Sequence, residues 1–240
     1  MICRCIGSMD GVRLLSEIHP QGHRNKQFNA VRQYQDWYAD LGITNVRALP
    51  FVDSIELLYR HCEQNNAVLV LRDWAHIDFI GPPSRRAPGF ELALDKKLAH
   101  EFDLLHCVIV RHPMEMWRSM RKMSVIIDND ITLEQHLSGY HKYLQQVNQF
   151  PLIRYEDFTR EPTVIMERIC RFLELPFDAD FMDKWPENNR ITGDVWNNSR
   201  ASGMKQIRHF DIQPLEFSML RLLSNNADYQ RIIHTLDYEF

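Results

Sequence analysis

The chain has 240 residues, of which 45% are apolar and 25% are charged, the balance of an ordinary globular protein and not of a disordered or fibrous one. Its 28 basic and 32 acidic residues give a formal net charge of −4, so it lacks the broad basic field of a general nucleic-acid binder. The longest apolar runs are too short to cross a bilayer, and no signal-peptide pattern stands at the start. The five cysteines are sparse, and four of them lie in apolar surroundings, Cys3, Cys5, Cys107 and Cys170, which indicates reduced thiols. We therefore expect a cytoplasmic protein with no nucleic-acid and no membrane partner.

Short apolar runs indicate buried strands, as in a parallel sheet that is covered on both faces. The predicted strands are Ile2 to Ile6, Ala67 to Leu71, Leu105 to Val110 and Leu152 to Tyr155. Stretches with apolar residues at helical spacing lie between them, which predicts βαβ units. The expected fold class is α/β: a single three-layer domain over residues 1–240, with a mostly parallel central sheet flanked by helices.

Helices are predicted between the strands and after them. Their ranges are Phe28 to Leu41, Asp53 to Cys62, Phe90 to Glu101, Thr132 to Gln149 and Pro162 to Leu173, and the chain is helical again from Pro214 onward. Thr132 followed by Gln135 has the capping-box pattern of a helix start. Two loops, around residues 81–89 and 186–203, are longer than a plain connection needs, which is typical of functional loops.

Ligands of parallel α/β sheets bind beyond the carboxyl ends of the strands, so the segments that follow the predicted strands are the candidate sites. The first of them bears two glycines, Gly7 and Gly11, and leads toward a predicted helix. Backbone N–H groups at such a helix start can cradle a phosphate, although an ordinary strand-to-helix turn would have the same pattern. The predicted phosphate-binding residues here are Gly7, Ser8, Met9, Asp10, Gly11, Val12 and Arg13.

The segment after the third predicted strand begins with Arg111 and continues through Pro113 to Ser119. Pro113 suits the first turn of a helix, where a missing N–H costs nothing. An arginine at a strand tip can donate two hydrogen bonds to a pair of phosphate oxygens. The alternative is an arginine in a surface ion pair and a serine without a role.

Together with the segment after the fourth predicted strand, this one resembles the sulfotransferase family, which uses 3′-phosphoadenosine 5′-phosphosulfate as its sulfuryl donor. Arg111, Pro113 and Ser119 match the family's Arg-x-Pro-x-x-x-x-x-Ser segment. Arg154 to Phe158 matches a strand end that reads Arg-Tyr-Glu-Asp-Leu, with Phe for Leu. Phe172 to Pro176 matches a helix end that reads Phe-Leu-Gly-Leu-Pro, with Glu for Gly. The order and spacing of the blocks fit, and the resemblance covers about residues 1–210.

The resemblance implies a P-loop NTPase-like sulfotransferase fold, with the donor nucleotide as co-substrate and no metal. Arg111 and Ser119 would hold the 3′-phosphate, and the segment from Gly7 to Arg13 would hold the 5′-phosphosulfate. The family usually has a basic residue where Met9 stands and two threonines where Val12 and Arg13 stand, and Arg13 is the candidate for the missing catalytic cation. This difference from the family's loop is equally compatible with weak donor binding or lost activity.

A late basic loop also resembles a family feature, a flexible loop that covers the 3′-phosphate. Its candidate binding residues are Arg200 and Gly203, with Lys205 behind them, and the alternative is a solvated loop with incidental charge. No histidine, cysteine or carboxylate spacing predicts a metal site.

The general base is expected just after the second predicted strand, where the family's cytosolic members carry a histidine close to a basic residue. His76 is the candidate, with Arg72 as a further catalytic residue, because an imidazole titrates near working pH and can accept the proton of an acceptor hydroxyl. Asp73 and Asp78 are rival bases. A histidine that caps the turn or packs on Trp74 is the alternative without a catalytic role.

The sequence therefore predicts a sulfotransferase that moves a sulfuryl group to a hydroxyl or amine of an unidentified small-molecule or glycan acceptor. A binding module that keeps the nucleotide pocket without catalysis is one alternative, and a small-molecule kinase with a phosphate-binding loop is another. A homo-oligomer is left open.

Overall fold

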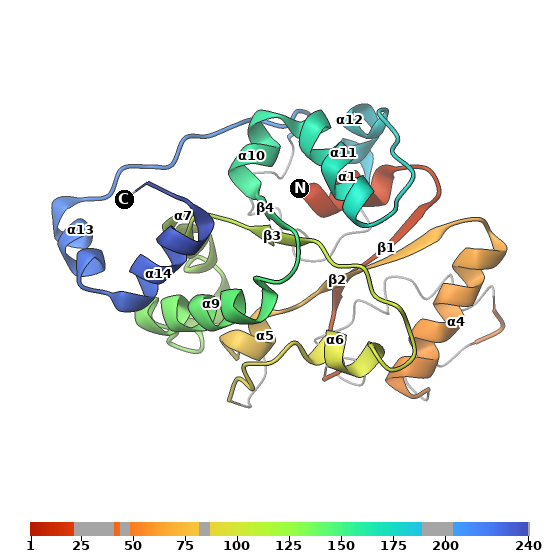
Figure 1. Cartoon of the computed structure of the whole chain (residues 1–240), viewed down its shortest axis with the longest axis horizontal. Helices are drawn as coiled ribbons and strands as arrows, with labels where there is room; N and C mark the ends of the chain where they lie inside the picture. The colour runs from red at the N-terminus through yellow and green to blue at the C-terminus, as the bar shows by residue number, and fades with distance from the viewer. Residues whose placement is uncertain (22–40, 44–48, 82–86, 189–203, 240) are drawn as a thin grey trace. The chain divides into compact units, whose positions relative to one another are not determined.

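The computed structural model describes residues 1–21, 41–43, 49–81, 87–188 and 204–239, apart from the side chains of residues 124 and 125. The chain divides into two compact units, each made of stretches that are far apart in the sequence: residues 1–74, 93–105 and 166–207 in the first, and residues 75–92, 106–165 and 208–240 in the second. Each unit combines helices with parallel strands (Figure 1), so the predicted α/β class is confirmed. The single-domain boundary stays a prediction.

The first unit contains a parallel pair of strands, β1 (Val12–Ile18) and β2 (Val68–Asp73), in which Val12 is the partner of Val68 and Leu15 of Leu71. Left-handed residues precede both strands: Gly11 has a φ of 75° and Asn66 a φ of 52°. Glycine and asparagine are the residues that adopt this conformation most readily, so the turns into the two strands are encoded locally.

Apolar side chains of β1 and two helices form the core of the first unit. The helices are α4 (Phe51–Gln64) and α6 (Ala93–Leu98). The buried core residues are Leu15, Ile18, Phe51, Ile55, Leu58, Leu94 and Leu98. The N-terminal helix α1 (Ile2–Ser8) contacts β1, the short helix α12 (Phe181–Lys184) and the 3₁₀ helix η3 (Trp185–Glu187).

The second unit contains the parallel pair β3 (Val108–Val110) and β4 (Leu152–Arg154). Each strand leads directly toward a helix: α7 (Pro113–Met120) follows β3, and α10 (Tyr155–Arg160) follows β4. The short helices α5 (His76–Phe79) and α8 (Ser124–Ile127) belong to the same unit. Helix α11 (Pro162–Phe172) begins in this unit and ends in the first.

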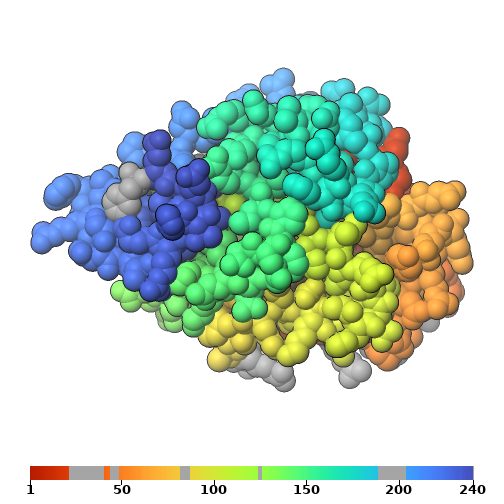
Figure 2. Space-filling model, in the orientation of Figure 1, coloured from red at the N-terminus to blue at the C-terminus, as the bar shows by residue number. Residues whose placement is uncertain are grey.

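Helix α9 (Leu133–Val147) begins with the predicted capping box: the Thr132 hydroxyl accepts the Gln135 N–H at 3.2 Å, and the Gln135 side chain accepts the Thr132 N–H at 2.9 Å. It packs beside α14 (Ala227–Leu236), and α13 (Phe217–Ser224) contacts α14 as well (Figure 1). In the space-filling view, the blue C-terminal residues lie against green residues of the same unit (Figure 2). The buried core residues are Val108, Val110, Met114, Leu137, Tyr140, Leu144, Val147, Leu223, Tyr229, Ile232, Ile233 and Leu236.

Three of the predicted strands are confirmed as β2, β3 and β4, but the first is wrong because residues 2–8 are helical. Ile2, Cys5 and Ile6 are the buried residues of α1, and their spacing of three and four is that of a helix face. A five-residue apolar run fits either element by pattern alone, and here the helical spacing prevails. The true first strand, β1, comes ten residues later. The predicted helix over 28–41 lies outside the described residues except for its last residue.

Within the described residues, no helix is long and apolar enough to cross a membrane.

The buried imidazole of His136, on α9, makes the second unit sensitive to acid. Its side chain is 1% exposed, its Nε2 lies 3.3 Å from the Pro113 carbonyl oxygen, and its ring lies 5.5 Å from that of Trp117. Burial lowers the pKa of His136 to about 4. The unfolded chain takes up a proton on this group near pH 6.5 and the folded chain only near pH 4, so its stabilising effect is complete above pH 6.5 and is lost as the pH falls. We expect the free energy of unfolding to fall by about 2 kcal/mol between pH 7 and pH 5.

Urea unfolding at pH 5, 6 and 7 checks this prediction. His136→Gln is expected to lose most of the dependence, and His112, whose pKa burial also lowers, accounts for part of the remainder. His234→Gln is the matched control because that imidazole, on α14, is exposed. An unchanged pH dependence in His136→Gln would contradict the prediction.

Candidate functional site

Strands β3 and β4 end at one edge of their sheet, because Val110 is the register partner of Arg154. Arg111 and His112 follow β3 there, and Tyr155 and Glu156 open the helix that follows β4. We call these four residues the arginine edge. Since ligands of parallel sheets bind beyond the carboxyl ends of the strands, the arginine edge is the candidate site of the second unit.

The guanidinium of Arg111 is partly exposed and only partly engaged. Its side chain is 30% exposed, Nη2 lies 3.5 Å from a Glu115 oxygen, and Cζ lies 5.1 Å from the centre of the Tyr155 ring. Its Nε is buried and has no hydrogen-bond partner in the part of the chain that the structure describes. A buried donor without a partner costs free energy, so an anion that accepts a hydrogen bond from Arg111 Nε would stabilise the protein.

The carboxylate of Glu115 does not serve as the anion that binds Arg111, because its main partner is Arg118. Glu115 is 5% exposed and accepts a hydrogen bond from Arg118 Nη1 at 2.6 Å and one from the Gln213 N–H at 3.3 Å. Its 3.5 Å separation from Arg111 is longer than a good charge-assisted hydrogen bond. A phosphate oxygen at normal hydrogen-bond distance would therefore bind Arg111 more strongly than Glu115 does.

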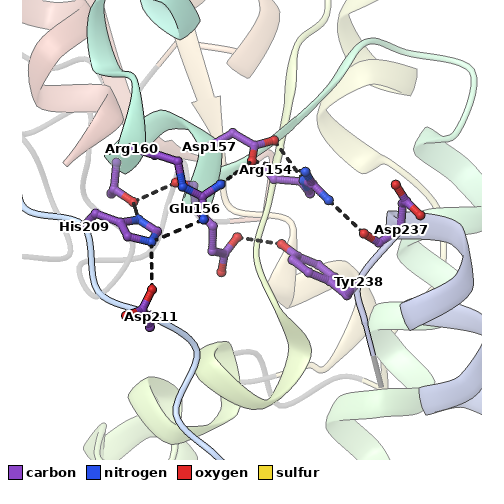
Figure 3. Close-up of polar contacts among 9 residues, drawn as sticks. Arg154, Glu156, Asp157, Arg160, His209, Asp211, Asp237 and Tyr238 are labelled. Carbon is purple, nitrogen blue, oxygen red and sulfur yellow. Dashed lines mark hydrogen bonds and ion pairs between the residues drawn. The ribbon is translucent and has the colours of Figure 1, made fainter.

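The buried carboxylate of Glu156 connects the C-terminal segment to the arginine edge through Tyr238 (Figure 3). Glu156 accepts the His112 N–H at 3.1 Å and the Tyr238 hydroxyl at 2.6 Å. Burial and the bond to Glu156 raise the pKa of Tyr238, so its hydroxyl stays protonated and donates. Arg154 adds a second tie, donating to Asp157 Oδ2 and to the Asp237 carbonyl, each at 2.8 Å.

A second group of polar residues joins the end of α10 to the segment that precedes α13 (Figure 3). The buried Thr159 hydroxyl donates to the Glu156 carbonyl at 2.9 Å and lies 3.0 Å from His209 Nδ1. His209 Nε2 lies 3.4 Å from an Arg160 nitrogen and 3.5 Å from an Asp211 oxygen. Asp211 is 99% exposed, so its ion pair with His209 is weak, and the group anchors the segment rather than forming a reactive centre.

The elements predicted around Arg111 are confirmed, whereas its predicted role and that of Ser119 stay predictions. Arg111 directly follows β3, Pro113 is at the start of α7, and Ser119 is an exposed residue near the end of that helix. Arg200 and Gly203 lie outside the described residues, and Lys205 is exposed.

The first unit has its own strand edge, where β1 and β2 end. Arg72 donates to the buried Ser16 hydroxyl at 2.8 Å, and its Nη2 lies 3.6 Å from a Glu17 oxygen. The β1–β2 register is irregular between Leu15 and Ile18, and Glu17 there has a φ of 56°, which is unusual for a residue other than glycine. Just beyond, the buried imidazole of His19 accepts the Gln21 N–H at 3.2 Å.

Sequence reasoning missed Ser16, Glu17 and His19 because it placed the first strand too early. A signal for the true strand was present: the run from Val12 to Ile18 is bounded by Gly11 before it and Pro20 after it. Glycine and proline commonly punctuate strands in this way.

The structural basis of the phosphate-loop prediction for residues 7–13 is wrong. Gly7 and Ser8 end helix α1, Met9 is buried with its sulfur 3.8 Å from the Cys170 thiol, and Asp10 pairs with Lys184 at 3.1 Å. These residues precede β1 and therefore lie at its amino end. Gly11 makes the turn into the strand, and the strand itself contains Val12 and Arg13.

Arg13 in particular is remote from the carboxyl end of its strand. It is exposed, its Nη1 donates to the neighbouring Val12 carbonyl at 3.2 Å, and it pairs in register with Leu69. Ile18, at the end of the strand, is five residue steps further along the chain, which is about 16 Å at the usual rise per residue. The argument that made Arg13 a catalytic cation therefore no longer holds.

The candidate base His76 is the first residue of α5, three residues after the end of β2 in the sequence. Its carbonyl accepts the N–H groups of Ile80 and Gly81, which closes the turn at the other end of that short helix. Asp78 is buried within α5. No group of three or more possible metal ligands occurs among the described residues.

Comparison with known proteins shows which family and fold the chain resembles. Residues 114–208 match the family model of the sulfotransferase domain. This match begins just after Arg111 and includes Ser119 and the block from Arg154 to Phe158. No curated protein matches the sequence significantly.

Solved structures of low sequence identity share the fold. The chain resembles the sulfotransferase domain from the Synechococcus PCC 7002 olefin synthase, with 18% identity and a TM-score of 0.61 over 100% of this chain and 90% of that one. It also resembles the sulfotransferase domain from the curacin biosynthetic pathway, with 16% identity and a TM-score of 0.50 over 100% and 93% of the two chains. The fold is that of sulfotransferase domains. The predicted resemblance to the sulfotransferase family is confirmed.

Proposed function

We propose that the protein is a sulfotransferase that moves a sulfuryl group from 3′-phosphoadenosine 5′-phosphosulfate to a hydroxyl or amine, releasing adenosine 3′,5′-bisphosphate. The family match and the fold support the class of reaction. The observation that carries the donor assignment is the buried Nε of Arg111, which has no partner within the described residues and lies at a strand end. The donor supplies the activated sulfuryl group, so the protein has to bind and orient the reactants.

Arg111 would bind the 3′-phosphate of the donor, with Ser119 adding a hydroxyl. The Tyr155 ring and the carboxylate of Glu115, which is itself paired with Arg118, contact the guanidinium and leave donors for a phosphate. Arg200 and Gly203 remain proposed contacts to the same phosphate.

In the first unit, the position proposed for the 5′-phosphosulfate is the carboxyl end of β1, where His19 lies, in place of residues 7–13. The rule that ligands bind at the carboxyl ends of parallel strands supports this position. Arg72, at the end of β2, is the described cation of this edge and stays a proposed catalytic residue. Its bonds to Ser16 and Glu17 orient it.

His76 is proposed as the general base that accepts the acceptor's proton. The acceptor is proposed to be a small molecule or a glycan, with no nucleic-acid or membrane partner and a cytoplasmic location. The alternative function, a module that binds the nucleotide without catalysis, was suggested by the unusual residues Met9, Val12 and Arg13 in a predicted phosphate loop. Because that segment does not follow a strand, it no longer supports this alternative.

Isothermal titration calorimetry with adenosine 3′,5′-bisphosphate and with AMP tests the 3′-phosphate site. Arg111→Ala is expected to weaken binding of the bisphosphate by about 10- to 150-fold, the equivalent of about 1.5–3 kcal/mol for a hydrogen bond to a charged group. Binding of AMP should change little. Arg121→Ala is the matched control, because Arg121 is an exposed arginine that directly follows α7.

Equal affinity of the unmodified protein for the two nucleotides would refute the proposed site. A parallel assay of sulfuryl transfer from the full donor separates an enzyme from a module that only binds.

A further inference from the structure

A tyrosine outside the two sequence blocks Arg111 to Ser119 and Arg154 to Phe158 holds the backbone of Arg111 on both sides of its Cα atom. The Arg111 N–H donates to the Tyr140 hydroxyl oxygen at 3.1 Å, and the Tyr140 hydroxyl donates to the Arg111 carbonyl at 2.8 Å. Tyr140 comes from the middle of α9, is 5% exposed and lies 29 residues away in the sequence. One hydroxyl thus satisfies both backbone polar groups of a single residue.

These bonds begin where the strand ladder stops. The register of β3 with β4 ends at Val110, so the next residues have no strand partner to fix their peptide groups. Tyr140 holds Arg111, and Glu156 holds the N–H of His112 at 3.1 Å. Because the direction of a side chain follows from the backbone angles at its Cα, the Tyr140 hydroxyl determines where the Arg111 guanidinium is presented.

We propose that Tyr140 is a positioning residue for the 3′-phosphate of the donor nucleotide and acts through the backbone of Arg111. The inference rests on the proposed function, since it requires that Arg111 bind that phosphate. Burial raises the pKa of Tyr140, which keeps the hydroxyl protonated so that it can donate and accept at once.

The ring and the hydroxyl of Tyr140 have separable roles. The ring packs in the core of the second unit with Leu137 and Leu144, and its centroid lies 6.5 Å from that of Tyr143. Tyr140→Phe keeps this packing and removes only the hydroxyl. Any loss of stability would weaken binding of all nucleotides alike, whereas loss of positioning would weaken only binding through the 3′-phosphate.

The experiment measures the dissociation constants of adenosine 3′,5′-bisphosphate and AMP for the full chain by calorimetry, and takes their ratio as the 3′-phosphate discrimination. Tyr140→Phe is expected to lower this discrimination on the order of tenfold, the effect of about one good hydrogen bond, and to leave AMP affinity unchanged. Tyr143→Phe is the matched control. It removes a hydroxyl from the same helix, and Tyr143 is not among the partners of Arg111 in the described part of the chain.

The outcomes separate this inference from the proposed function. If the unmodified protein does not discriminate between the nucleotides, the proposed 3′-phosphate site fails, and the inference fails with it. If the unmodified protein discriminates and Tyr140→Phe discriminates equally well, only the role of Tyr140 is overturned.

If Tyr140→Phe does not fold, amide hydrogen exchange of the unmodified protein tests the role of Tyr140 instead. The Arg111 N–H is expected to be protected, because it donates to a buried hydroxyl, and addition of the bisphosphate, but not AMP, should increase that protection. Exchange at the solvent rate in the presence of the bisphosphate would overturn the inference.

Discussion

Replacing Gly139 by alanine is expected to destabilise the protein by roughly 3 kcal/mol or more. Gly139 lies in α9, where a Cβ atom would meet the backbone oxygen of Phe79 at 2.3 Å and the side chain of Ile80 at 3.3 Å. By helix propensity alone alanine would stabilise the helix by about 1 kcal/mol. Overpacking typically costs about 1–3 kcal/mol, and the upper end applies because the clash is with a backbone carbonyl that no rotamer change can move.

Thermal and urea unfolding measure this effect, with Gly89→Ala as the control. A Cβ at Gly89 would come only within 3.8 Å of Glu91, which is ordinary contact, so this variant should keep the unfolding midpoint of the unmodified protein. Since Phe79 ends the helix that begins at His76, Gly139→Ala should also lower catalytic activity. An unchanged midpoint would show that α5 and α9 pack less closely than the structure has them.

Replacing His76 by alanine is expected to lower kcat by about 10²–10⁴-fold, the usual contribution of a positioned general base. Affinity for adenosine 3′,5′-bisphosphate should remain nearly unchanged, because the base acts on the acceptor and not on the nucleotide. The acid limb of the pH–rate profile should also disappear, since an imidazole that must be neutral to accept a proton causes that limb. Sulfuryl transfer followed across pH measures both effects.

His100→Ala is the control, because His100 is an exposed histidine outside both strand edges. The competing bases are tested by Asp73→Asn and Asp78→Asn. If either of these abolishes turnover while His76→Ala remains active, the base is a carboxylate. If none of the three matters, the acceptor needs no base from this segment.

The longest and most regular element of the second unit could be predicted from the sequence. The start of α9 has both members of a capping box, and its apolar residues recur at helical spacing over four turns. Such signals are local, so neighbouring elements do not alter them. The five residues from Ile2 to Ile6 have neither a capping motif nor several turns of apolar spacing. Their interpretation as a strand placed the predicted phosphate-binding site at the amino end of β1 instead of its carboxyl end.

Of the candidate site, the position of Arg111 after a strand and before a helix was predictable, and its surroundings were not. Glu115 is four residues away and could be guessed from helix geometry. Tyr140, Glu156 and Tyr238 reach the same edge from distant elements, and their hydroxyl and carboxylate groups are common in surface positions. Nothing in a single sequence marks which of them becomes buried against a particular backbone group.

The interleaved composition of the two units has a consequence for synthesis on the ribosome. The first unit includes residues 166–207 and the second includes residues 208–240. Neither unit can therefore complete its contacts when its first strands emerge from the ribosome, because its last residues are synthesised much later. Tyr238 is translated 82 residues after its partner Glu156, an interval of about 4–16 s at ordinary elongation rates. During that time the side of α9 that later packs on α14 is without its cover. The nascent chain is therefore expected to depend on chaperones until its last helix has left the exit tunnel.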